Sequence, residues 1–268
     1  MNERPNVDEA QSSEQLRKES LRNARRVRQL EATLQGLEQI RDTNARLLDR
    51  LMVELDAERT RSHDLLLNVL PQHIIDRLNA GEQIADRHED VAVVFSDFVG
   101  FTEISARLPA AALVKELNEL FSAFDRACVA FGVEKIKTIG DAYFAAAGLA
   151  DSPGNAVAAA ADLALAMREV VRAAGDPWQV RIGLHVGPVV AGVIGTRKYV
   201  YDLWGDAVNV ASRLETTAPR GSIQISEAAA ARLGDAFELE PRGAVELKGK
   251  GTTETFLLLG RRTGSGSD

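Results

Sequence analysis

The N-terminal quarter of the chain carries apolar residues at alternating steps of three and four. The first and fourth positions of this heptad are occupied by Val27, Leu30, Leu34, Leu37, Arg41, Asn44, Leu48, Leu51 and Leu55. With charged residues between them, the repeat predicts a coiled coil over residues 16–64 that joins two chains. Arg41 and Asn44 weaken the seam while fixing its register. A solvated single helix is the alternative, and the polar residues 1–15, which have no period, are predicted to be disordered.

Residues 65–89 are predicted to form a helical linker. A leucine-rich run ends at Pro71, which can open a helix but cannot lie inside one. A short helix is therefore expected over 71–79, before Gly81. The chain has no proline between Pro5 and Pro71, and twenty of its 21 glycines follow residue 80. Pro71 is thus the predicted boundary between two parts and a candidate hinge.

Short apolar runs and helical periods alternate over residues 90–260. Strands are predicted at 91–95, 133–139, 178–186, 189–194 and 222–225 and near 237 and 256, and helices around 113–124, at 156–174 and after Asp206, read as an N-cap. The order strand, helix, strand, strand, helix, strand predicts an α+β fold. We expect a ferredoxin-like antiparallel sheet with helices on one face, followed by additions. Residues 261–268 are predicted to be a flexible tail.

Charge and composition exclude several classes of protein. The hydrophobic fraction of 45% and the charged fraction of 26% are those of a globular protein. The net charge of −7 argues against a nucleic-acid partner, because such binding relies on neutralising phosphates. A single cysteine, Cys128, excludes an internal disulfide. No apolar run is long enough to span a membrane and no signal segment is recognised, which predicts a cytoplasmic location, with membrane tethering if the chain is a fragment.

Two acidic residues follow predicted strands. Asp97 ends the first strand before a glycine turn, and Asp141 lies in the Gly140–Asp141 turn between the next two. In a ferredoxin-like sheet the first strand lies beside this hairpin, so the two carboxylates can meet at one edge. Paired hard oxygen donors suit one or two Mg²⁺ ions beside phosphate. The alternative is that both residues only stabilise turns.

Other polar positions are open to two interpretations. Asn209 and Arg213 are four residues apart on one helix face and could grip a single target, or form an exposed surface pair. Lys248 and Lys250 alternate with glycines, as in an anion-binding loop or an ordinary basic turn. The glycine run after Gly187 lacks the lysine and hydroxyl of a P-loop. His185 and Cys128 are each interpreted as core residues.

Three stretches resemble the signature segments of class III nucleotidyl cyclases. They are residues 95–102, FSDFVGFT, residues 134–143, EKIKTIGDAY, and residues 201–215, YDLWGDAVNVASRLE. The resemblance extends over about residues 65–259, and three long motifs in order are far more specific than a lone glycine pattern. It implies the catalytic domain of such a cyclase over residues 90–260.

The resemblance also implies a role for each matched position. Asp97 and Asp141 match metal ligands for two ions of Mg²⁺ or Mn²⁺ per site, and Asn209 and Arg213 match the residues that act on the ribose and the α-phosphate. The positions that match phosphate contacts are Phe98, Val99, Gly100, Thr102, Arg197 and Lys248. Lys137 and Asp202 match the residues that read the base, where guanylyl cyclases carry a glutamate and usually a cysteine. Lysine donates to a ring nitrogen and aspartate accepts from the amine of adenine, so ATP is the expected substrate. No general base stands out.

In this family each site forms between two catalytic domains, so the resemblance implies a homodimer through the catalytic domain as well as the coiled coil. Members often carry a sensor or membrane domain upstream, so the chain is expected to be a soluble adenylate cyclase or the output half of a receptor. A guanylyl cyclase and a nucleotide-sensing adaptor without turnover are the alternatives. Lys137 and Asp202 argue against the first, and the intact metal positions argue against the second.

Overall fold

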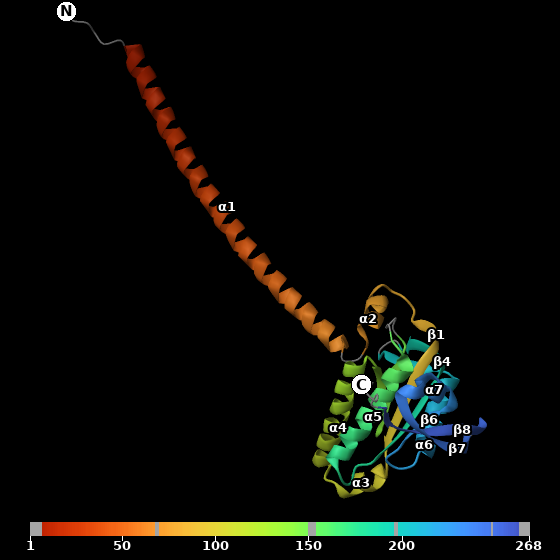
Figure 1. The fold of residues 1–268 in the computed structure, drawn as a ribbon. Helices are drawn as coiled ribbons and strands as arrows, with labels where there is room; N and C mark the ends of the chain where they lie inside the picture. The colour runs from red at the N-terminus through yellow and green to blue at the C-terminus, as the bar shows by residue number, and fades with distance from the viewer. Residues whose placement is uncertain (1–6, 68–69, 150–153, 196–197, 248, 263–268) are drawn as a thin grey trace, which may run out of the picture. The chain divides into compact units, whose positions relative to one another are not determined.

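The computed structural model describes residues 7–67, 70–149, 154–195, 198–247 and 249–262. The chain divides into two compact units, residues 1–72 and 73–268, and each is described by itself (Figure 1). None of the helices in these described ranges is both long enough and apolar enough to cross a bilayer.

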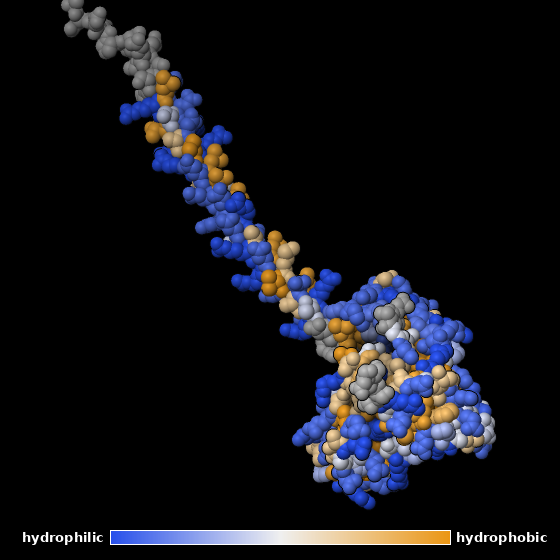
Figure 2. Space-filling model, in the orientation of Figure 1, coloured by the Kyte–Doolittle hydropathy of each residue, from blue (hydrophilic) through white to orange (hydrophobic). Residues whose placement is uncertain are grey.

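The first unit is dominated by one long helix, α1 (Val7–Leu67). It begins at Val7, so residues 7–15, which were expected to be disordered, are helical. The apolar heptad residues are all exposed, the least being Leu51 at 51% and the most Leu55 at 70%. Figure 2 shows apolar side chains along the helix among charged ones. The single chain leaves the seam uncovered, and the coiled coil stays a prediction.

The second unit is built on a large sheet. Its strands are β1 (Ala85–Phe98), β2 (Glu134–Ile139), β3 (Ala142–Ala147), β4 (Val180–Ile194), β5 (Val200–Trp204), β6 (Ile223–Ser226), β7 (Phe237–Leu247) and β8 (Gly251–Arg261). The α-helices that follow α1 are α2 (Gln72–Asn79), α3 (Phe101–Arg107), α4 (Ala110–Phe131), α5 (Ala156–Ala174), α6 (Asp206–Thr217) and α7 (Glu227–Leu233), and a 3₁₀ turn spans Gly234–Ala236. The two strands expected over 178–194 are one continuous strand, and β8 extends to Arg261, into the expected tail.

The strand order is β2-β3-β1-β4-β6-β8-β7, with β5 paired to the far half of β4. The first four strands and the helices α4 and α5 form a βαββαβ unit in which each neighbouring pair of strands is antiparallel. This confirms the ferredoxin-like α+β core. One later pair, β4 with β6, is parallel, because α6 provides the crossover between them. The sheet is therefore mixed beyond the core.

The helices cover both faces of the sheet, which corrects the expectation of one covered face. Residues 92, 94 and 98 of β1 and 180, 182, 184 and 186 of β4 pack into one apolar core with α4 and α5. The alternate residues face α6. A Cβ on Gly183 would lie 2.2 Å from the carbonyl oxygen of Ala211, and one on Gly187 would lie 3.2 Å from Cβ of Ala207. These two glycines let α6 approach the backbone of β4.

The segment that was predicted to be a helical linker contains a helix and the start of a strand. Helix α2 begins directly after Pro71, as the proline indicates. Ile74 and Ile75 are its buried residues. Strand β1 begins at Ala85, and the guanidinium of Arg77 on α2 pairs with the carboxylate of Asp86 on β1. The linker is thus attached to the first strand of the sheet.

Candidate functional site

Asp97 and Asp141 lie together at one edge of the sheet. Asp97 is near the end of β1, and Asp141 follows Gly140 in the β2–β3 turn, whose positive φ of 65° suits glycine. Burial raises the pKa of the Asp141 carboxyl to about 6, and the charge of Asp97 and a hydrogen bond with it act in the same direction. The structure brings together the two acids that the sequence pointed to.

This carboxylate pair fits a divalent cation. Two like charges in contact repel each other, which favours protonation of one of them or a bound positive ion. Mg²⁺ binds through one or two carboxylates together with the phosphates of a substrate. Within the described ranges, no group of three or more His, Cys, Asp or Glu side chains could hold a metal ion. Asp97 and Asp141 could hold such an ion together with phosphate oxygens, and their assignment as metal ligands stays a prediction.

Several residues that the resemblance matches to phosphate contacts lie at the turn after β1. Gly100 has φ 70° and precedes α3, and Thr102 is exposed on the first turn of that helix. The amide of Val99 donates to the carbonyl of Gln179 at 2.8 Å. In this conformation that amide is therefore already used, whereas the sequence assigned it to a phosphate. Phe98 is 2% exposed and contributes to the core through its ring.

Lys137 and Asp202 form an ion pair, although 65 residues separate them in the sequence. Lys137 is on β2 and Asp202 on β5, and their side chains are 34% and 14% exposed. The other oxygen of Asp202 accepts the amide of Leu203 at 2.9 Å, which fixes the carboxylate. The two positions that the resemblance matches to base reading therefore lie side by side on the same chain, an arrangement that spacing alone did not predict.

Asn209 and Arg213 lie on α6 as the four-residue spacing indicates. The Asn209 amide makes a long contact of 3.4 Å to the carbonyl of Gly205, and its side chain is exposed. Among the described residues, Arg213 has no carboxylate partner. Asp206 was expected to cap this helix, but the N-cap is Gly205, and Asp206 pairs instead with Lys250. Arg197 and Lys248 lie outside the described residues.

Arg181 and Glu215 were not found by sequence reasoning. Arg181 lies opposite Asp97 on the neighbouring strand, with its Nη2 3.2 Å from Oδ2 of Asp97. Its Nε lies 3.2 Å from Oε1 of Glu215 on α6. Burial raises the pKa of Glu215 to about 7, with the charge of Asp97 acting in the same direction and Arg181 opposing both. A buried acid on an amphipathic helix, two residues after Arg213, was the available signal.

Of the two residues interpreted as core, Cys128 is confirmed in that role, whereas His185 is not among the buried residues of the core. Cys128 is 3% exposed, and burial raises the pKa of its thiol to about 11, so it is not a nucleophile at neutral pH. His185 is half-buried, and its Nδ1 lies 2.8 Å from the hydroxyl oxygen of Ser226. Burial lowers the pKa of the imidazole, which favours its neutral form.

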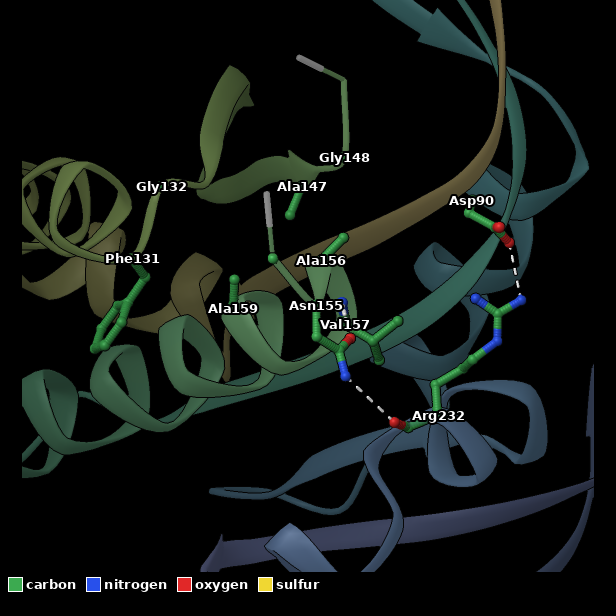
Figure 3. Close-up of a pocket in the computed structure, with 11 residues that line it drawn as sticks. Asp90, Phe131, Gly132, Ala147, Gly148, Asn155, Ala156, Val157, Ala159 and Arg232 are labelled. Atoms are coloured by element: carbon green, nitrogen blue, oxygen red, sulfur yellow. Dashed lines mark hydrogen bonds and ion pairs between the residues drawn. The ribbon is translucent and has the colours of Figure 1, made fainter. Parts of the chain in front are cut away.

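A separate cavity of about 620 Å³ lies beside the N-terminus of α5 (Figure 3). Asn155 caps this helix by accepting the amides of Val157 and Ala158, and Arg232 pairs with Asp90 at 2.8 Å across the cavity. None of the sequence-predicted site residues that the structure describes lines it. The cavity therefore adds nothing to the candidate site.

Known proteins share both the sequence and the fold. The family model "Adenylate and Guanylate cyclase catalytic domain" matches residues 84–260. An adenylate cyclase of Mycobacterium tuberculosis is 44% identical over 214 residues, which are 78% of this chain and 48% of that protein. Retinal guanylyl cyclase 2 of Bos taurus is 38% identical over 246 residues, 87% of this chain and 22% of that protein. The chain thus spans half or less of the length of these relatives.

A solved structure supports the same assignment. The guanylate cyclase domain of RhGC from Catenaria anguillulae, in complex with GTP, is 36% identical with a TM-score of 0.63. The match covers 66% of this chain and all of that one. The matched sequence and the shared fold show that the chain belongs to the adenylate and guanylate cyclase catalytic domain family, the class III nucleotidyl cyclases.

Proposed function

We propose that this protein is an adenylate cyclase that converts ATP to 3′,5′-cyclic AMP and pyrophosphate. The observation that carries the proposal is the contact between Asp97 and Asp141 on a chain of the cyclase family. A carboxylate pair of this kind suits a cation beside a triphosphate. The relatives include adenylate and guanylyl cyclases, so the family alone leaves the base open.

The proposed reaction is an in-line attack of the ribose 3′-hydroxyl on the α-phosphate, with pyrophosphate leaving. Two ions of Mg²⁺ or Mn²⁺, when bound, supply positive charge at the attacking and leaving oxygens. Asp97 and Asp141 would hold these ions. Arg213 places a fixed positive charge at the α-phosphate, where negative charge develops, and Asn209 orients the ribose. Thr102, Arg197 and Lys248 bind the phosphates, and no side chain is assigned as general base.

The choice of adenine rests on Lys137 and Asp202. Their ion pair holds a donor and an acceptor side by side. The ammonium of Lys137 can donate to a ring nitrogen, and the carboxylate of Asp202 can accept from the exocyclic amine of adenine. Guanine presents a carbonyl and a protonated ring nitrogen at the same edge. With ATP and GTP competing in one reaction, we expect cyclic AMP to dominate, and preferential formation of cyclic GMP would refute the argument.

A complete site is proposed to need two chains. The metal acids come from one copy, and the base-reading residues with Asn209 and Arg213 come from the other. Apolar side chains are exposed on the paired strands β4 and β5, with Ile194 at 57%, Trp204 at 39% and Val200 at 37%. Asp202 lies on the same pair of strands. This surface suits a second copy of the chain, and α1 suits a coiled coil.

Mixing two inactive variants tests the shared site. Asp97→Ala and Arg213→Ala chains should each be inactive, because each removes one half of both sites. In a random mixture, half of the dimers are mixed and each has one intact site of two, so about a quarter of wild-type activity should return. Cyclic AMP formation with Mn²⁺ is the measurement. Inactive mixtures of stable dimers would contradict the shared site, and a wild-type chain that binds ATP without turnover would instead support an adaptor.

A further inference from the structure

Arg181 is held between two acids that come from different elements. It is paired in register with Asp97 across β4 and β1, and Glu215 approaches it from α6. Both contacts are 3.2 Å long. The Glu215 side chain is 10% exposed, compared with 28% for Arg181 and 25% for Asp97. The guanidinium is therefore shared between a candidate metal ligand and a buried acid outside the metal pair.

Packing holds Glu215 in this place. A Cβ on Gly183 would lie 2.3 Å from the backbone nitrogen of Glu215, so the helix rests directly on β4. Gly183 is two residues after Arg181 on the same face of the strand. The nitrogen Nε and the oxygen Oε1 are close but are not aligned as a hydrogen bond. The contact is thus an ion pair fixed by the backbone positions of α6 and β4.

The sharing of Arg181 has a consequence for metal binding. A guanidinium that pairs with Asp97 alone neutralises that carboxylate and competes with a cation for it. A second acid on the other side of the guanidinium also pairs with it, which weakens its pairing with Asp97 and restrains its position. Less of the negative charge of Asp97 is then neutralised by Arg181, and more of it remains available beside Asp141, where a divalent ion would bind.

We propose that Glu215 is a positioning residue for the metal half of the site: it holds Arg181 so that the guanidinium orients Asp97 without neutralising it. The inference rests on the proposed function for the role of Asp97. Residues around metal ligands tune metal affinity by about 10- to 100-fold. Glu215 also lies on the helix that carries Asn209 and Arg213, so its effect on the metal must be separated from an effect on those two residues.

Direct binding of Mn²⁺ to the full chain without nucleotide provides the first test. Electron paramagnetic resonance gives the free Mn²⁺ concentration. We expect Glu215→Gln to weaken binding by about 10-fold. Glu134→Gln is a matched control, because Glu134 is a partly buried acid that also has a raised pKa, but it lies toward the other end of the β2–β3 hairpin from Asp141. Equal affinity in Glu215→Gln and wild type would overturn the proposal.

A double variant tests whether Arg181 is the intermediary. In Glu215→Gln the unshared guanidinium competes with Mn²⁺ for Asp97. Adding Arg181→Gln removes this competitor, so the double variant should bind Mn²⁺ more tightly than Glu215→Gln alone, by about 3-fold or more. Circular dichroism would confirm that both variants are folded. A folded double variant that binds Mn²⁺ no better than the single variant contradicts the route through Arg181.

Mixed dimers separate the two ends of α6. In the Asp97→Ala and Arg213→Ala mixture, the working Asp97 lies on the Arg213→Ala chain. Glu215→Gln placed in that chain should lower activity at limiting Mn²⁺ at least 3-fold more than the same change in the Asp97→Ala chain. An equal or reversed effect would mean that Glu215 acts through α6 itself. If the parent mixture is inactive, the proposal of a site shared between two chains is contradicted. The Mn²⁺ titrations still test the role of Glu215.

Discussion

The long helix α1 and the second unit of the chain, residues 73–268, which we call the catalytic unit, differ in the burial of their apolar side chains. In the catalytic unit, Phe124, Met167 and Leu184 are fully buried within a single chain. On α1, Leu34 and Leu37 are each 59% exposed. Helices in water gain most of their stability from a packed face rather than from propensity. The comparison teaches that one chain completes the core of the catalytic unit but leaves the apolar seam of α1 uncovered, as expected of a helix that pairs with a second copy.

The largest difference between the two regions is expected when the packing of α6 against β4 is disturbed. We expect Gly183→Ala to destabilise the catalytic unit by about 3 kcal/mol, because the new methyl group would lie 2.2 Å from a backbone oxygen. A methyl group added at Gly36 on α1 would meet nothing within 4 Å, so Gly36→Ala should instead stabilise its helix by about 1 kcal/mol. Urea unfolding followed by circular dichroism measures both. A tolerant Gly183→Ala would show that α6 can move away from β4.

The second test removes part of the α1 seam. Leu34→Ala with Leu37→Ala keeps helix propensity but loses apolar burial between two copies, so the dimer should dissociate at least 10-fold more readily. Sedimentation velocity and the dependence of activity on protein concentration measure this. The matched control is Val53→Ala, at a heptad position outside the seam and 70% exposed, which should behave as wild type. Unchanged association of the double variant would favour the solvated single helix.

The smallest expected effect concerns Glu134, a partly buried acid of the catalytic unit. Burial raises the pKa of Glu134 to about 7 from its usual 4.5, so the folded state binds the proton more tightly than the unfolded state. Its favourable contribution is complete below pH 4.5 and is lost as the pH rises to 7. Glu134→Gln should therefore be more stable than wild type by about 1 kcal/mol at pH 8 and equal at pH 4.5.

Thermal unfolding at both pH values gives this difference. Glu169→Gln is the control, since that side chain is 58% exposed in a surface ion pair with Arg172. The same stability difference at pH 8 and pH 4.5 would show that the Glu134 carboxyl does not carry the effect.

Local signals predicted several elements well. The alanine-rich period gave α5 its bounds, Ala156–Ala174, and Pro71 marked the start of α2. The division of β4 into two strands was wrong: Gly187 and Pro188, which separate the two expected strands, lie inside one continuous strand. In the structure the pairing of β1 shifts register between His88 and Val91, opposite Pro188. An irregularity there accommodates a residue that has no amide donor.

The parts of the candidate site that lie in sequence motifs could be predicted, whereas the parts that depend on tertiary packing could not. The meeting of Asp97 and Asp141 follows from strand adjacency in a βαββαβ unit. The ion pair of Lys137 with Asp202 depends on β5 folding back near β2, which no local pattern encodes. The face of β4 on which α6 packs is set by Gly183 and Gly187. Their four-residue spacing is visible in the sequence but was not interpreted as a contact with a helix.

Strand β1 is also a mechanical element. At one end Asp86 is paired with Arg77 of the linker helix α2, and at the other end the strand carries Asp97. Eleven residues of extended chain span about 36 Å between these two acids. β1 pairs with β4 over most of its length and with β3 over residues 92–96, so the sheet would resist a pull on α2 and little of it would be absorbed as stretching of β1. The register shift after His88 is the most compliant point on this path, and loosening it would uncouple the two ends.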